Sequence, residues 1–162
     1  SGVVASDTAG VGTGTEGPGG AEYGGDKAIF AFGTTGSVTN ISRLVNNSGV
    51  ISADIAGVGT ARYSLRAAGY GNDKGIFGFG RTPSNTGVTN LVSNTGVVAA
   101  DVAAVGAARK GPGACVYGGD KAIFSFGSPA YTNLVSNSGV VASDVTQVGT
   151  SKYGTSGAGY GN

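Results

Sequence analysis

Short apolar stretches alternate with glycine- and asparagine-rich turns along the chain, and this pattern predicts β-strands. In one repeated unit, taken as an example, we expect strands at residues 61–69, 74–79, 87–93 and 97–102. The last three of these stretches contain valine, isoleucine or phenylalanine, and none of the four carries an apolar stripe at helical spacing. Gly-Gly-Asp, Gly-Asn-Asp and Asn-Thr-Gly between them are typical of hairpin turns, because glycine and asparagine tolerate a positive φ.

The pattern is an internal repeat. Elements that read Ser-Gly-Val-Val-Ala, or a close variant, start at residues 1, 48, 95 and 138, so the periods are 47, 47 and 43 residues. The string Tyr-Gly-Gly-Asp-Lys-Ala-Ile-Phe-Ala-Phe-Gly of residues 23–33 returns with small changes at 70–80 and 117–127. A constant frame with one variable loop is typical of stacked supersecondary units. We therefore treat 1–162 as a single repeat domain whose last unit is partial.

The strand that carries the phenylalanines indicates how the units pack. In residues 28–32, the two-residue alternation of a strand places Phe30 and Phe32 on one face. Ile29 and Ala31 point to the other face, so neither face is polar and both should be buried. The second face is small in every unit, at Ala31, Gly78 and Ser125. Bulky and small faces suit sheets that stack, each bulky face meeting a neighbour's small face.

Four-stranded antiparallel sheets stacked on both faces are the blades of a β-propeller, whose repeats run roughly 40–50 residues. We predict an all-β propeller with about 3.5 blades per chain. Propellers need roughly four to eight blades to close, so we expect a homodimer to complete the ring. A count of 14 strands per chain gives 28 for two chains, or about seven blades. The terminal strands do not form ordinary blades in this count. Two alternatives therefore remain: the ring has six blades with additional terminal strands, or the chain is a fragment of a longer array of repeats.

The order of these signals resembles the Kelch family. Arg62, the pair Ala67-Ala68 and the apolar strand that ends at Gly80 follow the order of a Kelch blade, while the second glycine and the tryptophan of that family are missing. The strings Tyr-Gly-Gly-Asp-Lys-Ala-Ile-Phe and Thr-Asn-Leu-Val-Ser-Asn are similar to tandem repeats in structural or tail-associated proteins of tailed bacteriophages. That resemblance implies a virion or extracellular component and assigns no active site.

Composition narrows the possible functions. The 162 residues have no His, no Trp, one Cys, 12% charged residues and a net charge of +1. There is thus no basic patch for nucleic acid and no apolar run long enough for a membrane. Without histidine, His-based metal sites and Ser-His or Cys-His dyads are excluded. Only Glu16 and Glu22 add carboxylates outside the regular aspartates, so we predict no enzyme activity, no cofactor and no metal. Cys115 replaces Ala68 of the repeat, and we expect it to be a buried, small apolar residue.

Charged residues recur with the repeat in two sets. Aspartates precede a lysine at the turn into the second strand, and we expect them to cap turn N–H groups; they are Asp26, Asp73 and Asp120. Acidic and basic residues also lie eight apart, and we expect ion pairs that tie one blade to the next. These pairs are Asp54 with Arg62, Asp101 with Arg109 and Asp144 with Lys152. The alternative is a charged rim that binds anionic or sugar ligands.

The first unit departs from this set. It keeps Asp7 but has Thr15 in place of the arginine, followed by Glu16. We interpret the departure as the mark of a junction where the unit has different neighbours.

Tyrosines are the candidate ligand contacts. Those that precede the turn in each unit should pack between blades; they are Tyr23, Tyr70, Tyr117 and Tyr160. Tyr63, Tyr131 and Tyr153 lie outside that frame and are candidates to stack on sugar rings. The leading hypothesis is a non-enzymatic structural or interaction propeller. The alternatives are a lectin-like protein with one shallow glycan site per blade, and a designed or excised repeat fragment without a ligand.

Overall fold

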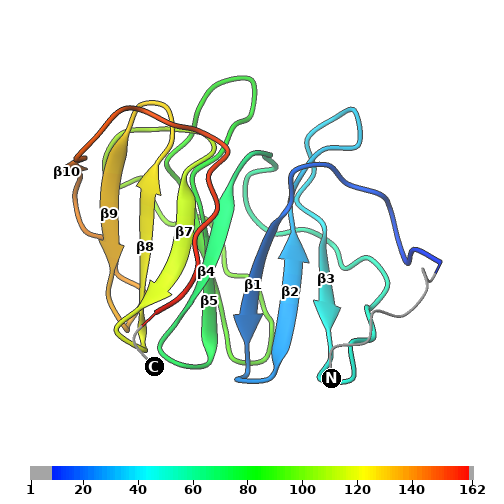
Figure 1. Cartoon of the computed structure of the whole chain (residues 1–162). Coiled ribbons are helices and arrows are strands. Elements are labelled where there is room, and N and C mark those ends of the chain that lie inside the picture. Colours follow the sequence, from blue (N-terminus) through cyan, green and yellow to red (C-terminus); the bar gives the residue numbers. More distant parts are fainter. Residues whose placement is uncertain (1–8, 161–162) are drawn as a thin grey trace.

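The computed structural model describes residues 9–160, which form ten strands in three antiparallel sheets (Figure 1). Sheet 1 contains β1 (Gly19–Tyr23), β2 (Lys27–Ala31) and β3 (Ser42–Val45). Sheet 2 contains β4 (Arg66–Tyr70), β5 (Lys74–Gly78) and β6 (Thr89–Val92). Sheet 3 contains β7 (Gly113–Tyr117), β8 (Lys121–Phe126), β9 (Tyr131–Val135) and β10 (Val145–Thr146). The prediction of an all-β chain of antiparallel sheets is confirmed.

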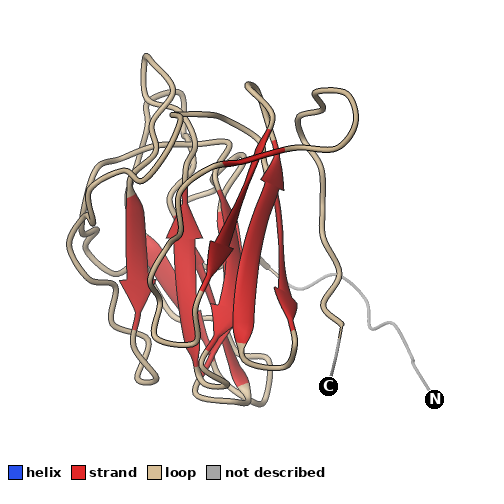
Figure 2. Ribbon diagram, turned by 90° about the vertical axis from the view of Figure 1, so that its left-hand side faces the viewer, coloured by secondary structure: helices blue, strands red, loops and turns tan. Residues whose placement is uncertain are grey.

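The strands of each sheet follow one another in chain order, and the sheets stand side by side. The first strands are neighbours, with β4 between β1 and β7 (Figure 1). Figure 2 shows strands joined by loops and no helix. Accordingly, residues 9–160 offer no helix of the length and apolarity that crossing a membrane demands.

The fourth predicted strand of each unit forms only in part. In sheet 2, two backbone bridges join β6 to the ends of segment 98–102. Between those bridges the segment holds one residue more than β6, and such a β-bulge interrupts the ladder. Asn90 Nδ2 donates to Ala99 O at 3.0 Å, so a side chain bonds a carbonyl of the bulged segment. Sheet 1 has the same offset, as does sheet 3, where the short strand β10 is added.

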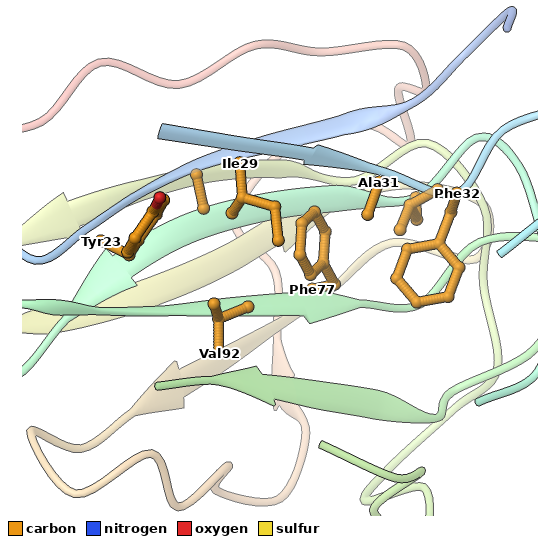
Figure 3. Packing of buried hydrophobic residues seen from close by; sticks show 8 residues of the cluster. Tyr23, Ile29, Ala31, Phe32, Phe77 and Val92 are labelled. Atoms are coloured by element: carbon orange, nitrogen blue, oxygen red, sulfur yellow. The ribbon is translucent and has the colours of Figure 1, made fainter. Parts of the chain in front are cut away.

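Sheets 1 and 2 enclose an apolar core. Phe77 of β5 reaches across to sheet 1, where its ring meets Phe32 edge-on with the centroids 5.3 Å apart. Figure 3 shows Phe77 beside Ile29 of β2, and all three side chains are buried. Sheets 2 and 3 repeat the arrangement through Phe124, whose ring centroid lies 5.2 Å from that of Phe79. The apolar strand is therefore buried because it packs between neighbouring sheets.

The two phenylalanines of one strand lie on opposite faces, and the prediction that they share a face is wrong. Phe77 contacts sheet 1, whereas Phe79 contacts sheet 3. The last phenylalanine of each string has a positive φ, which breaks the two-residue alternation; the values are 65° for Phe32, 61° for Phe79 and 66° for Phe126. A bulky side chain still meets a small one, since a Cβ added at Gly78 would lie 2.8 Å from the Phe124 ring.

Candidate functional site

Sheets 1 and 3 each keep a face that no other sheet of residues 9–160 covers. Phe30 is 43% exposed on sheet 1, whereas the equivalent Phe77 and Phe124 are fully buried against the preceding sheet. Leu134 is 40% exposed on sheet 3, whereas the equivalent Leu91 packs against the core between sheets 2 and 3. The free face of sheet 1 therefore carries residues that elsewhere contact a preceding sheet. The free face of sheet 3 carries residues that elsewhere contact a following one.

The hairpin turns add matching backbone groups. The Gly24 N–H in the first turn donates to Asp73 O in the second turn at 2.7 Å, and the second turn is joined to the third in the same way. Asp26 of sheet 1 is equivalent to the acceptor Asp73, so its carbonyl is an acceptor of the same kind. Gly118 of sheet 3 is equivalent to the donor Gly24, so its N–H is a donor of the same kind. Neither forms such a turn-to-turn bond within the part of the chain that the structure describes. The two free faces are complementary in hydrogen bonding as well as in apolar residues.

Residues 154–160 lie along β7 (Figure 1). Gly154 N–H donates to Gly111 O at 2.9 Å, and Tyr160 N–H donates to Val116 O at 3.2 Å. The segment repeats residues 111–117, so it takes the place beside β7 that β7 takes beside β4. Leu134 of β9 is left as an exposed apolar part of the sheet 3 face.

A cavity of about 370 Å³ lies between the first strands of the three sheets and residues 154–160. Glycine and alanine dominate its lining, where Glu22 is the only carboxylate. Cys115 also lines it and is partly exposed, so the prediction that this residue is buried is wrong. Desolvation raises the pKa of the Cys115 thiol above its ordinary value, which disfavours the nucleophilic thiolate. Within residues 9–160, no three side chains that bind metals come together.

Arg62 is a buried charge where sheets 1 and 2 meet. Its Nε donates to Phe79 O at 2.9 Å, and Nη2 donates to Asn90 Oδ1 at 2.7 Å. The guanidinium lies over the Phe32 ring of sheet 1, with Cζ 4.1 Å from the centroid. Burial lowers the pKa of Arg62 to about 10, an effect that the nearby Asp101 opposes. The side chain therefore stays charged at neutral pH and joins the two sheets.

The predicted pairing of charges eight residues apart is wrong. Asp54 Oδ1 accepts a hydrogen bond from Arg43 Nε at 2.6 Å, and Asp54 forms no ion pair with Arg62. The segment between Asp54 and Arg62 crosses from one sheet to the next, which separates the two charges. Each aspartate lies at the end of the segment that follows the third strand of its own sheet. That end is close to the residues that precede the first strand of the same sheet. The aspartate therefore meets the basic residue of its own sheet.

Sheet 3 also brings its aspartate close to the arginine of the same sheet. Asp144 Oδ1 lies 3.9 Å from Arg109 Nη1, and the Arg109 guanidinium stacks 3.6 Å above the Phe79 ring centroid. Burial lowers the pKa of Arg109 to about 10, and Asp144 opposes this effect. Lys152, which takes the place of the arginine in the last unit, is exposed, and its carbonyl accepts a hydrogen bond from Gly127 N–H at 2.7 Å. Lys152 is outside the ion pairs found among residues 9–160.

Sheet 1 places its guanidinium from a different strand. Thr15 stands where sheet 2 has Arg62, and Arg43 stands where sheet 2 has Asn90. Arg43 Nη1 donates to Thr15 Oγ1 at 3.4 Å. This exchange keeps one guanidinium and one short polar side chain at this position of sheet 1. That the first unit lies at a junction with different neighbours stays a prediction. Asp7, which the sequence also placed in that unit, lies outside the described residues.

The aspartates fasten the segments that enter each sheet. Asp101 Oδ2 accepts from Thr60 Oγ1 at 2.6 Å, and Oδ1 accepts from Asn90 Nδ2 at 2.9 Å. Asp54 Oδ2 accepts from Thr13 Oγ1 at 2.7 Å in sheet 1. Burial tends to raise the pKa of Asp101, but the bonds from Thr60 and Asn90 outweigh it, so the pKa lies below its ordinary value.

We therefore expect stability to fall in acid. A carboxyl group whose pKa is lowered on folding stabilises the protein above the unfolded pKa of 3.8, and this contribution is lost as the pH falls through the folded value. Asp101→Asn should cost about 1 kcal/mol at neutral pH, because the carboxylate is partly exposed, and should reduce the loss in acid. Urea unfolding between about pH 7 and pH 3 measures both. An unchanged acid response in the variant would contradict this role for Asp101.

The aspartates of the hairpin turns are held by neighbouring side chains. Their carboxylates lie 2.5 Å, 2.6 Å and 3.1 Å from the Nζ of the following lysine, for Asp26, Asp73 and Asp120 in turn. Asp120 also accepts from Asn137 Nδ2 at 2.9 Å. The pKa values of all three aspartates are lowered, mainly by these side-chain hydrogen bonds. Lysine and asparagine side chains are thus the main partners of these carboxylates, and a backbone hydrogen bond in each turn lowers the pKa further.

The regular tyrosines differ in exposure. Tyr23 and Tyr70 are buried between sheets, and the Tyr70 ring lies against Gly139 of the next sheet. Tyr160 is exposed, and its ring centroid lies 6.4 Å from that of Tyr117. Stacking of a following sheet is what buries the tyrosine of this repeat position.

The three candidate ligand tyrosines do not share one site. Tyr63 pairs through its backbone with Arg81, Tyr131 lies half-buried in β9, and Tyr153 is 72% exposed beside Lys110. Tyr63 and Tyr153 occupy one repeat position, which holds Glu16 in the first unit and Lys110 in the third. Aligning the repeats residue by residue would have shown this variable position.

The comparisons with known proteins place the chain in no family: no protein-family model matches it, and no curated protein matches it.

Proposed function

We propose that this chain is a non-enzymatic structural module that associates with a second copy of itself, and that the paired copies complete a propeller-like ring. The observation that carries the proposal is the match between its two free faces. Phe30 lies on the free face of sheet 1, and its equivalents in the other two sheets pack against the preceding sheet. Leu134 lies on the free face of sheet 3, and its equivalent in sheet 2 packs against the following sheet.

Burial supports this proposal. An apolar ring such as Phe30, left 43% exposed where its equivalents are fully buried, gains free energy when a further sheet covers it. The turn groups Asp26 O and Gly118 N–H would repeat the 2.7 Å bonds that join the turns within the chain. Head-to-tail contacts of this kind form closed rings when the rotation between copies closes. In the junction, residues 154–160 of one copy supply the strand beside β7.

The chemistry of the chain supports a role without catalysis. The cavity between the first strands holds a single carboxylate, Glu22, and the thiol of Cys115 has a raised pKa. The Kelch-like order of signals and the phage-like strings of the repeat lead us to propose a component of a virion, where such modules form part of the particle. One equal glycan site in every repeat is not favoured, since Tyr23 and Tyr70 are buried.

Light scattering tests the association. A chain of 15.6 kDa should give a mass of about 31 kDa as a dimer, and Phe30→Asp or Leu134→Asp should return it to the mass of one chain, because each places a charge in an apolar contact. Val97→Asp is the matched control, since Val97 is 64% exposed on the middle sheet and should leave the dimer intact. Circular dichroism establishes that each variant is folded.

A folded wild-type chain that keeps the mass of one copy at every concentration would overturn the proposal. A dimer that both aspartate variants leave intact would show that the two copies meet elsewhere, which also overturns it.

A further inference from the structure

A small cavity opens at the junction of sheets 2 and 3, where three segments far apart in the sequence meet. Its volume is about 150 Å³, and its lining consists of Ser64, Arg66, Lys110, Gly111, Tyr153 and Gly154. This is below the roughly 300–1,000 Å³ of sites for drug-sized ligands, so the cavity suits one small ring.

Backbone hydrogen bonds hold the walls of this cavity together. Gly111 N–H donates to Ser64 O at 2.8 Å, and Gly154 N–H donates to Gly111 O at 2.9 Å. The three segments are therefore joined in series by main-chain bonds. A frame of this kind keeps the side chains around it in place before a ligand arrives, which lowers the entropy cost of binding.

The cavity carries positive charge without an acidic partner. Arg66 and Lys110 line it, no carboxylate does, and neither residue forms an ion pair within residues 9–160. Arg66 Nε donates to Thr155 O at 3.2 Å, and Nη1 donates to Leu65 O at 2.9 Å. These two carbonyls fix the guanidinium plane and leave Nη2 to donate to a ligand. A fixed guanidinium beside an ammonium group suits a carboxylate.

An aromatic ring lies beside the charges. Tyr153 is 72% exposed, and Lys110 Nζ lies 5.6 Å from its ring centroid. The apolar face of an exposed tyrosine can pack against the C–H face of a sugar ring, while its hydroxyl stays in water. The cavity thus places one apolar surface next to two cations.

This combination occurs at one junction only among the described residues. Lys110 and Tyr153 occupy the same repeat position in the third and fourth units. The first and second units have Glu16 and Tyr63 at that position. Arg66 stands where other units have Gly19, Gly113 and Ser156. The repeated frame needs none of these three side chains, because the same strands and bridges form without them. The repeat therefore does not require the three side chains together, although Arg66 also holds Thr155 through its hydrogen bond.

We propose that this cavity binds a sugar ring that bears a carboxylate, such as a uronic acid residue. Arg66 and Lys110 contact the carboxylate, and Tyr153 packs against the ring. The site is built from one chain, so it does not depend on the association proposed above.

Titration by NMR with the methyl glycosides of glucuronic acid and glucose tests the proposal, because these probes differ only in the carboxylate. Glucuronide should bind at least about tenfold more tightly than glucoside. Acetate and inorganic phosphate, which lack a sugar ring, should bind more weakly than glucuronide. Arg66→Gln and Tyr153→Ala should each weaken glucuronide binding by about tenfold.

Tyr63→Ala, at the repeat position of Tyr153 two units earlier in the chain, is the control and should leave binding unchanged. Equal binding of glucuronide and glucoside would overturn the role of the two cations. Phosphate binding as tight as glucuronide binding, unaffected by Tyr153→Ala, would show a general anion site and would also overturn the proposal. Resonances of the core that stay unshifted in each variant establish that the fold is intact.

Discussion

Phe77→Ala is expected to lower the free energy of unfolding by about 3–5 kcal/mol, the range for deleting a fully buried phenylalanine side chain. The Phe77 ring is fully buried and meets Phe32 across the boundary between two sheets. Its removal leaves a void that the neighbouring strands cannot fill, because both are held in hydrogen-bonded ladders. Urea unfolding followed by circular dichroism measures the loss.

Phe30→Ala is the matched control, because Phe30 has the same repeat position and chemistry but is 43% exposed. It should cost only about 1 kcal/mol. Measurements at several protein concentrations separate this cost from any loss of association, since only the latter depends on concentration. Equal losses for Phe30 and Phe77 would show that stacking between sheets is not what makes these rings stabilising.

Arg62→Thr is expected to destabilise the chain by about 2–6 kcal/mol, because it leaves two buried acceptors without their donor, at roughly 1–3 kcal/mol each. The carbonyl of Phe79 and the amide oxygen of Asn90 would lose their donors. Asn90→Arg alone should also destabilise, since it brings a second guanidinium against the buried Arg62. The double variant recreates the Thr15 and Arg43 arrangement of sheet 1, so it should recover a large part of the loss.

A double-mutant cycle measures that recovery. We expect a coupling free energy of about 1–3 kcal/mol between positions 62 and 90. Arg62→Thr combined with Lys74→Ala is the control, because Lys74 contacts Asp73 at the opposite end of sheet 2. That pair should be additive to within about 0.5 kcal/mol. Additive losses at positions 62 and 90 would contradict the view that the two sheets hold one guanidinium in alternative ways.

The strands and their stacking could be predicted from the chain alone, because both depend on local patterns that repeat. Runs of apolar residues bounded by Gly-Gly-Asp and Gly-Asn-Asp place the second strand of a unit closely, since the predicted 74–79 is β5 (Lys74–Gly78). The predicted first strand 61–69 is too long, because β4 covers only Arg66–Tyr70. An apolar strand without a polar face requires cover on both sides, which the neighbours of β5 supply. Because the pattern recurs along the chain, it also predicted several sheets of similar structure.

Other features depended on groups that are distant in the sequence. The positive φ of Phe79 reverses the face of its ring, and the one-residue bulge opposite β6 interrupts the fourth strand. Neither leaves a mark in the spacing of apolar residues, because both are single-residue changes in backbone conformation. They arise where the chain fits one sheet against the next.

For the candidate sites, the sequence determined which residue types recur, and the tertiary structure decided which of them meet. Asp54 and Arg62 are close in sequence but belong to different sheets, so Asp54 contacts Arg43 instead. Lys110 and Tyr153 are 43 residues apart and meet at one junction because the strands of neighbouring units lie side by side. A periodic chain specifies its own repeats through short-range hydrogen bonds and apolar patterns. Contacts between repeats depend on the path of the segment that connects one sheet to the next, and that path is known only from the tertiary structure.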